Sequence, residues 1–192
     1  MTRRARPPRG QNDQKPRPPR RAATPDEQRE QLLMYAFRAL GQRALSEAEL
    51  ERRMLRRNDD PGLVQAVLER VRDLGYLSDL QVAQAEAGRR GVGTGRVRQK
   101  LRQRGVGSEL IEEALAARDP DDEAEDARSL LERRWPSFRR AADPQRRAFD
   151  FLMRRGYGSA LIWTLLRERM AEQELEDLGT EEGEEGWAEE AE

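Results

Sequence analysis

Arginine clusters are the feature of this sequence with the clearest chemical potential. A guanidinium group pairs with a phosphate or a carboxylate through two parallel hydrogen bonds, so a dense set of arginines suits an anionic partner. We identify eleven candidate binding residues of this kind, which are Arg52, Arg53, Arg56, Arg57, Arg89, Arg90, Arg96, Arg98, Lys100, Arg102 and Arg104. The alternative is a solvated helix surface, because arginine is also a good helix former.

Catalytic chemistry has few candidate residues in this chain. The sequence contains no histidine and no cysteine, which removes the commonest general base, the commonest metal ligands and every cysteine nucleophile. Carboxylate pairs such as Glu112–Glu113 and Asp121–Asp122 fall on predicted exposed helix faces, without an apolar pocket that would make one of them an acid. We therefore expect no catalytic residues, no metal site and no cofactor, in a protein that is not an enzyme.

A glycine-rich segment, Gly91-Val92-Gly93-Thr94-Gly95, is a weak match to a phosphate-binding loop. Such loops follow a β-strand and end in a lysine followed by a serine or threonine. Neither feature occurs here. We interpret the segment as a flexible connection between two helices rather than as a nucleotide site.

The arginines belong to a helical phrase that recurs three times. The copies begin at Ser46, Gly93 and Pro144, so they are offset by 47 and then 51 residues. Corresponding apolar positions stay in register, and they include the sets Leu50, Val97, Ala148 and Leu68, Leu115, Leu166. A period of this length is typical of stacked helical repeats, which usually present long surfaces to other macromolecules.

Helix start and stop signals divide the chain into units of three helices. Ser46 with Glu49 has capping-box spacing, and Gly105 and Gly156 suit helix ends. No segment alternates with the period of two that marks a strand. We predict an all-α fold of three tandem three-helix, helix-turn-helix-like repeats in an elongated curved array. The predicted repeats are residues 26–78, 79–119 and 120–178.

Each repeat contains few large apolar side chains with which to build a hydrophobic core. A buried apolar side chain contributes roughly 1.5 to 3 kcal/mol, whereas ordering the backbone costs roughly 1 to 2 kcal/mol per residue. We therefore expect burial between neighbouring repeats to supply part of the stability. The third repeat holds most of the aromatic residues, which are Trp135, Phe138, Phe149, Phe151, Tyr157 and Trp163. Their helical spacing favours packing over stacking on nucleic-acid bases.

The two ends of the chain carry opposite charges, although the formal net charge is −1. Residues 1–25 contain eight arginines and lysines, one acid and six prolines, which predicts a disordered basic arm. Residues 172–192 contain eleven acids and no base, and we predict an acidic disordered tail at 179–192. No apolar run approaches the roughly 20 residues that span a bilayer. We expect a monomeric, cytoplasmic protein without membrane contact.

Three segments read, in chain order, ALGQRALSEAELERRMLRR, LERVRDLGYLSD and GTGRVRQKLRQRGVGSELIEEAL. They are followed by the third, looser copy of the helical phrase, which contains FLMRRGYGSALIWTLL. In this order they resemble the bacterial RecX regulatory family over about residues 32–170. The resemblance implies tandem three-helix repeats in a curved shape. It also implies binding to the RecA recombinase filament along its groove, contact with DNA, and inhibition of RecA.

By this resemblance, the chain is expected to be a non-enzymatic regulator that restrains RecA in recombination, DNA repair and the SOS response. The restrained activities would be filament growth, strand exchange, ATP hydrolysis and the coprotease function. The eleven candidate residues would contact RecA or single-stranded DNA. Whether they also contact double-stranded DNA stays an open question. Gln81 and Val82 depart from the arginine and the aromatic residue that the family usually has at these positions.

A DNA-binding transcription regulator is the alternative function. The segment LSEAELERRMLRRNDDPGLVQAVLERVRDLGYLSD also resembles a winged helix-turn-helix, in which Gly75-Tyr76-Leu77 would open the wing. Against this, no β-hairpin signal follows Tyr76 and the motif is repeated. A transcription factor needs one recognition helix for each DNA half-site, whereas three stacked copies of the motif suit an extended partner.

Overall fold

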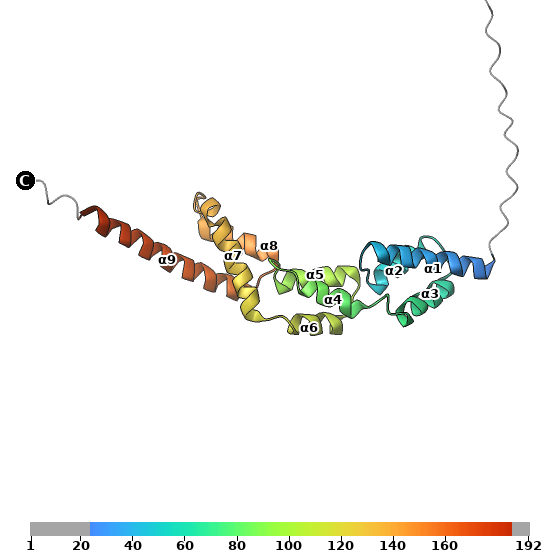
Figure 1. Ribbon diagram of the computed structural model, residues 1–192. Helices are drawn as coiled ribbons and strands as arrows, with labels where there is room; N and C mark the ends of the chain where they lie inside the picture. Colours follow the sequence, from blue (N-terminus) through green and yellow to red (C-terminus); the bar gives the residue numbers. More distant parts are fainter. Residues whose placement is uncertain (1–23, 186–192) are drawn as a thin grey trace, which may run out of the picture.

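The computed structural model describes residues 24–185, which form three helical bundles along one long axis (Figure 1). The nine helices of this part are α1 (Pro25–Gln42), α2 (Glu47–Leu55), α3 (Pro61–Asp73), α4 (Asp79–Ala87), α5 (Thr94–Arg104), α6 (Ser108–Ala116), α7 (Pro120–Phe138), α8 (Pro144–Arg155) and α9 (Ser159–Glu185). None of them is both long and apolar enough to span a bilayer. The predicted all-α fold of three tandem three-helix repeats is confirmed.

Local hydrogen bonds explain where the helices begin and end. Ser46 accepts from the backbone N–H of Glu49, whose side chain accepts from Ser46 in return, and this capping box starts α2. Gly105 and Gly156 end α5 and α8 with φ angles of +85° and +89°. Glycine suits these positions because a side chain disfavours left-handed backbone. The second helices of repeats 2 and 3 therefore end in the same way.

Each repeat has its own hydrophobic core. Buried side chains of the described residues form three separate clusters, which include Leu50, Met54 and Leu68 in repeat 1, Leu101 and Ile111 in repeat 2, and Leu152, Ile162 and Leu166 in repeat 3. The expected apolar burial between neighbouring repeats is therefore not what joins them. The repeats meet near helix ends, where hydrogen bonds, an ion pair and close glycine contacts join them.

Helices α1 and α9 extend beyond the expected bounds of repeats 1 and 3. Helix α1 begins at Pro25 after the N-cap Thr24, and the rest of the predicted basic arm lies outside the described residues. Helix α9 continues through residues 179–185, which were predicted to belong to a disordered tail. Glutamate is a good helix former and a helix propagates easily once it is nucleated. Residues 186–192 of the predicted tail lie outside the described residues.

The segment after repeat 1 does not form the wing of a winged helix-turn-helix fold. Gly75-Tyr76-Leu77 leads through Ser78, the N-cap residue, into α4. Residues 24–185 contain no strand. The alternative transcription regulator therefore lacks the β-hairpin that its DNA-binding fold requires.

Candidate nucleic-acid interface

The repeats meet at two joints with the same layout. In joint 1 the start of α2 contacts the end of α5, and in joint 2 the start of α5 contacts the end of α8. Equivalent positions follow the repeat period, because Ser46 of joint 1 corresponds to Gly93 of joint 2 and Arg104 corresponds to Arg155. The array is therefore built by one repeated contact between second helices.

Joint 1 is held by Arg104, the last residue of α5. Its guanidinium donates to Glu49 Oε2 at 2.9 Å, to Glu86 Oε1 at 3.3 Å and to the carbonyl oxygen of Ala44 at 2.7 Å. Ser46 Oγ donates to the carbonyl oxygen of Arg104 at 2.6 Å. The Arg104 side chain is only 12% exposed. This predicted binding residue therefore acts inside the molecule, because its donors are engaged by neighbouring helices.

Joint 2 is held by glycine backbone. The N–H of Gly93 donates to the carbonyl oxygen of Arg155, and that of Gly95 donates to the carbonyl oxygen of Gly156, both at 3.0 Å. A Cβ atom on Gly93 would overlap the Gly156 backbone, and one on Gly156 would overlap Arg96. The glycines therefore permit an approach of two helices that any side chain would block.

The glycine-rich segment is thus not the flexible connection that we expected. Carboxylates of α7 bind two further donors of the segment, since Asp126 accepts from the N–H of Gly91 at 3.0 Å and Glu123 accepts from the N–H of Thr94 at 2.8 Å. With the two glycine bonds of joint 2, four N–H groups of this segment have protein acceptors. They are not available to cradle a phosphate.

A basic groove of about 570 Å³ lies beside joint 2, between repeat 2 and α8. Five cationic side chains line it, which are Arg89, Arg96, Lys100, Arg154 and Arg155. Val92, Val97 and Phe151 form its apolar wall, and Glu86 is the one carboxylate in this lining. We call this feature the basic groove. Its positive charge and open shape suit a polyanion such as a nucleic-acid backbone.

The cations of the basic groove are not equally available. Arg96 and Arg154 are exposed and have no hydrogen-bond or ion-pair partner among the described residues. Arg155 donates to the carbonyl oxygen of Gly91 at 3.4 Å and lies over the ring of Phe151, with its guanidinium carbon 5.3 Å from the ring centroid. The remaining two cations are bound by Glu86.

Glu86 lies in the wall of the basic groove with only 9% of its surface exposed. Its Oε1 atom accepts from Lys100 Nζ at 2.8 Å and from Arg104 at 3.3 Å, and its Oε2 atom accepts from Arg89 at 3.4 Å. Burial raises the pKa of Glu86, but the positive charges of Lys100 and Arg89 lower it by a larger amount. The pKa of Glu86 is therefore below the usual value of a glutamate. One ionised carboxylate therefore binds three cations, two of which line the groove.

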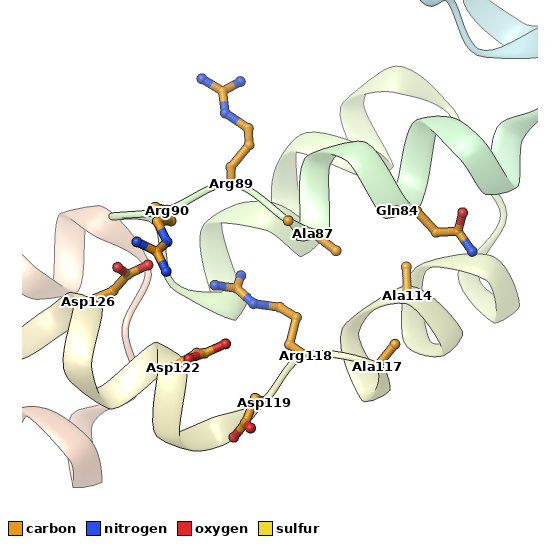
Figure 2. Close-up of a pocket in the computed structure, with 11 residues that line it drawn as sticks. Gln84, Ala87, Arg89, Arg90, Ala114, Ala117, Arg118, Asp119, Asp122 and Asp126 are labelled. Atoms are coloured by element: carbon orange, nitrogen blue, oxygen red, sulfur yellow. The ribbon is translucent and has the colours of Figure 1, made fainter.

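A second cleft of about 340 Å³ lies between α4, α6 and α7 (Figure 2). Arg90 and Arg118 of repeat 2 face Asp122 and Asp126 of α7 across it, whereas Arg89 points away. One guanidinium nitrogen of Arg118 is buried without a partner among the described residues. Mixed charges make this cleft less suitable for a polyanion than the basic groove. Among the side chains that the structure describes, no group of three or more acidic residues could hold a metal ion.

The eleven predicted residues do not share one face. The basic groove brings together Arg89, Arg96 and Lys100. Elsewhere, Glu112 of α6 binds Arg98 through two bonds of 2.8 Å, so this guanidinium already has a partner within the protein. Arg57 lies over the ring of Tyr35, 4.0 Å from its centroid. Arg104 lies in joint 1. The others outside the groove are Arg52, which donates to the carbonyl oxygens of Ala48 and Arg104, and Arg53, Arg56, Arg90 and Arg102.

Three charged groove residues were missed from the sequence, namely Glu86, Arg154 and Arg155, and Phe151 was assigned to packing alone. Arg155 lies 51 residues after Arg104, and Phe151 lies 51 residues after Lys100. Extending the candidate set by the repeat offset would have found both positions. Of the aromatic residues in repeat 3, Trp135, Phe138 and Tyr157 are buried, in keeping with the expected packing role, while Trp163 is 48% exposed.

Comparison with family models gives two matches along the chain. Residues 81–115 match the second three-helix domain of RecX, and residues 121–166 match the third three-helix domain of RecX. The two segments coincide with most of repeats 2 and 3. The matches therefore include the helices that form joint 2 and the basic groove.

Similar proteins cover most of the chain. The regulatory protein RecX of Deinococcus radiodurans is 54% identical over 166 residues, which is 86% of this chain and 81% of that protein. The regulatory protein RecX of Trichlorobacter lovleyi is 39% identical over 143 residues, which is 70% of this chain and 93% of that protein. A crystal structure of RecX from Lactobacillus salivarius has a TM-score of 0.67 at 15% identity, covering 74% of this chain and 97% of that one. A second crystal structure, of a regulatory protein RecX, has a TM-score of 0.65 at 19% identity, covering 75% and 73%.

Proposed function

This chain belongs to the RecX family of regulatory proteins, and we propose that it binds the RecA nucleoprotein filament and inhibits RecA in recombination, DNA repair and the SOS response. The inhibition acts on filament growth, strand exchange and ATP hydrolysis. The protein works by binding rather than by catalysis, as a monomer in the cytoplasm, where the RecA filament forms.

The basic groove is the observation that carries this proposal. It places five cationic side chains along one side of joint 2, on an elongated scaffold of three bundles (Figure 1). A filament presents a long, regular partner with a phosphate backbone inside it. An extended scaffold with a central basic groove fits such a partner better than a compact protein would.

We propose that the groove contacts the phosphodiester backbone of single-stranded DNA in the filament. Arg96 and Arg154 supply the first contacts, because both are exposed and have no partner among the described residues. Arginine forks bind phosphate oxygens in pairs, so each can hold one phosphate. Other predicted residues, such as Arg53 on α2 and Arg56 at its C-cap, remain candidates for contact with acidic parts of RecA.

The proposed function is tested with RecA assembled on single-stranded DNA in the presence of ATP. Addition of the protein should slow ATP hydrolysis and shorten the filaments seen by electron microscopy. The double charge reversal Arg96→Glu with Arg154→Glu should weaken both effects. The matched control is Arg146→Glu with Arg147→Glu, which makes the same charge change at exposed positions of α8 outside the groove.

Two results would contradict this proposal at different levels. Unchanged ATP hydrolysis and filament length with stoichiometric amounts of the protein would exclude inhibition of RecA. Equal loss of inhibition in the groove variant and in the control variant would show that overall charge, rather than the basic groove, carries the contact.

A further inference from the structure

One carboxylate, that of Glu86, lies in the lining of the basic groove. Of the five cations in its lining, Lys100 and Arg89 are bound by Glu86, whereas Arg96 and Arg154 are free of partners among the described residues. A phosphate that enters the groove therefore meets a carboxylate beside two of the cations that should bind it. The free protein presents less positive charge to a ligand than its composition implies.

We propose that Glu86 is an internal counter-ion that competes with the phosphodiester backbone of a nucleic acid for Lys100 and Arg89, and so limits the affinity of the basic groove. The inference deepens the proposed function and rests on its assignment of the groove to a nucleic-acid backbone. Glu86 thus lowers the affinity of the basic groove for a nucleic acid, in addition to binding Arg104.

The exposure of its three partners indicates which cations Glu86 can release. The side chains of Lys100 and Arg89 are 43% and 56% exposed, whereas that of Arg104 is 12% exposed. Long exposed side chains can turn from the carboxylate towards a ligand by rotating about their own bonds. Arg104 is fixed between helices by Glu49 and Ala44, so it stays with Glu86.

Competition also links the groove to joint 1. When a phosphate draws Lys100 and Arg89 away, Arg104 is the partner that remains for Glu86. A buried carboxylate binds its remaining cation more strongly when other cations leave, because desolvation must still be compensated. Occupation of the groove should therefore strengthen the bond between Glu86 and Arg104 within repeat 2, and Arg104 is the residue that also binds Glu49 of repeat 1.

The test is the affinity of the full chain for a fluorescein-labelled thymidine homopolymer, measured by fluorescence anisotropy in about 0.1 M salt. Glu86→Gln keeps the size of the side chain but removes its charge. Each additional phosphate contact with a single strand changes the logarithm of the binding constant by about 0.7 per tenfold change in salt. Release of one groove cation should therefore raise the affinity about fivefold and steepen its salt dependence.

Glu112→Gln is the matched control. It also removes one carboxylate bound to an arginine of α5, but Glu112 lies outside the groove lining. A specific role for Glu86 requires a clearly larger gain in Glu86→Gln than in Glu112→Gln. Addition of Lys100→Met to Glu86→Gln should remove most of the gain. Equal gains in both single variants, or a gain that survives Lys100→Met, would overturn the inference.

A second pair of variants keeps the test valid if Glu86→Gln does not fold. Lys100→Met should reduce affinity less than Arg154→Met, because Lys100 must leave Glu86 before it can bind, whereas Arg154 is free. A larger loss in Lys100→Met would overturn the role of Glu86.

The same titrations separate this inference from the proposed function. If the unmodified protein inhibits RecA but does not bind the oligonucleotide, the groove belongs to an acidic protein surface, and both the nucleic-acid assignment and the role of Glu86 fall. If it binds the oligonucleotide but Glu86→Gln does not bind more tightly, only the role of Glu86 falls.

Discussion

The two joints occupy equivalent places in the repeat, but different chemistry holds them. Joint 1 depends on side chains, chiefly the guanidinium of Arg104 between Glu49 and Glu86. Joint 2 depends on backbone, with Gly93 and Gly156 in direct contact. Both joints contain a close glycine contact, because a Cβ atom on Gly105 would overlap that of Ala48, but among the described residues only the first joint adds an ion pair between repeats.

One position of the repeat shows how this difference arises. In joint 1 the hydroxyl of Ser46 donates to the carbonyl oxygen of Arg104, and in joint 2 the backbone N–H of Gly93 donates to the carbonyl oxygen of Arg155. A side-chain donor and a backbone donor thus serve the same acceptor position. A repeated scaffold can keep its geometry while its joints differ in their response to acid, salt and substitution.

The largest expected effect is on joint 2. Gly156→Ala should lower the free energy of unfolding by about 3 kcal/mol, because a left-handed conformation costs roughly 1 to 2 kcal/mol for a residue with a side chain and the new Cβ would overlap Arg96. Chemical denaturation measures this loss. Gly75→Ala is the control, since Gly75 has φ +76° but no atom close to its Cβ position. Equal losses in the two variants would mean that close packing at joint 2 contributes little.

Joint 1 should respond somewhat less to loss of its central side chain. Arg104→Ala should lower the free energy of unfolding by about 2 kcal/mol, because two partly buried carboxylates lose one partner each. Arg98→Ala removes a pair with similar bond lengths to the exposed Glu112. It should cost much less, because solvent screens an exposed pair. Thermal unfolding of both variants tests this contrast, which fails if they are equally destabilised.

Acid should weaken joint 1 selectively. Burial raises the pKa of Glu49, but the N–H of Ser46 and the guanidiniums of Arg43 and Arg104 outweigh this effect, and the pKa is about 2 instead of 4.5. A lowered pKa stabilises the folded state above the unfolded value, and this stabilisation is lost as pH falls from about 4.5 towards 2. The loss should be roughly 2 kcal/mol by pH 2.

Urea denaturation at pH 6 and pH 2.5 measures this loss. In Glu49→Gln the difference between the two pH values should be smaller, because the titrating group is gone. An unchanged difference would remove Glu49 from the acid response of joint 1.

The smallest effect is expected beside joint 2, at Tyr157. Its buried hydroxyl has no hydrogen-bond partner among the described residues, so Tyr157→Phe should raise the free energy of unfolding by up to about 1 kcal/mol. Burial, together with Asp126 and Glu123, raises the pKa of Tyr157 to about 12. The stabilisation of the neutral form is present below pH 10 and is lost as pH rises through about 12.

Unfolding at pH 7 and pH 11.5 distinguishes the two forms of this residue. The phenylalanine variant should lose less stability at the alkaline pH than the unmodified protein. A variant that is destabilised at pH 7 would indicate that the hydroxyl has a partner after all.

The candidate site could be predicted only in part. Arginine density identified Arg89, Arg96 and Lys100, which do line the basic groove, but it could not separate them from Arg98 and Arg104. Spacing along one helix shows which side chains share a face. It does not show which carboxylates of other helices lie opposite them, so the availability of each cation was beyond prediction.

The sequence by itself determined the helices, most of their ends and their threefold recurrence, because capping boxes, terminal glycines and apolar periodicity act over a few residues. The tertiary structure decided what joins the repeats and which charges remain free. Glu49 and Arg104 are 55 positions apart, and Gly93 and Gly156 are further still. Contacts over such separations depend on how three bundles are oriented, which local patterns do not encode.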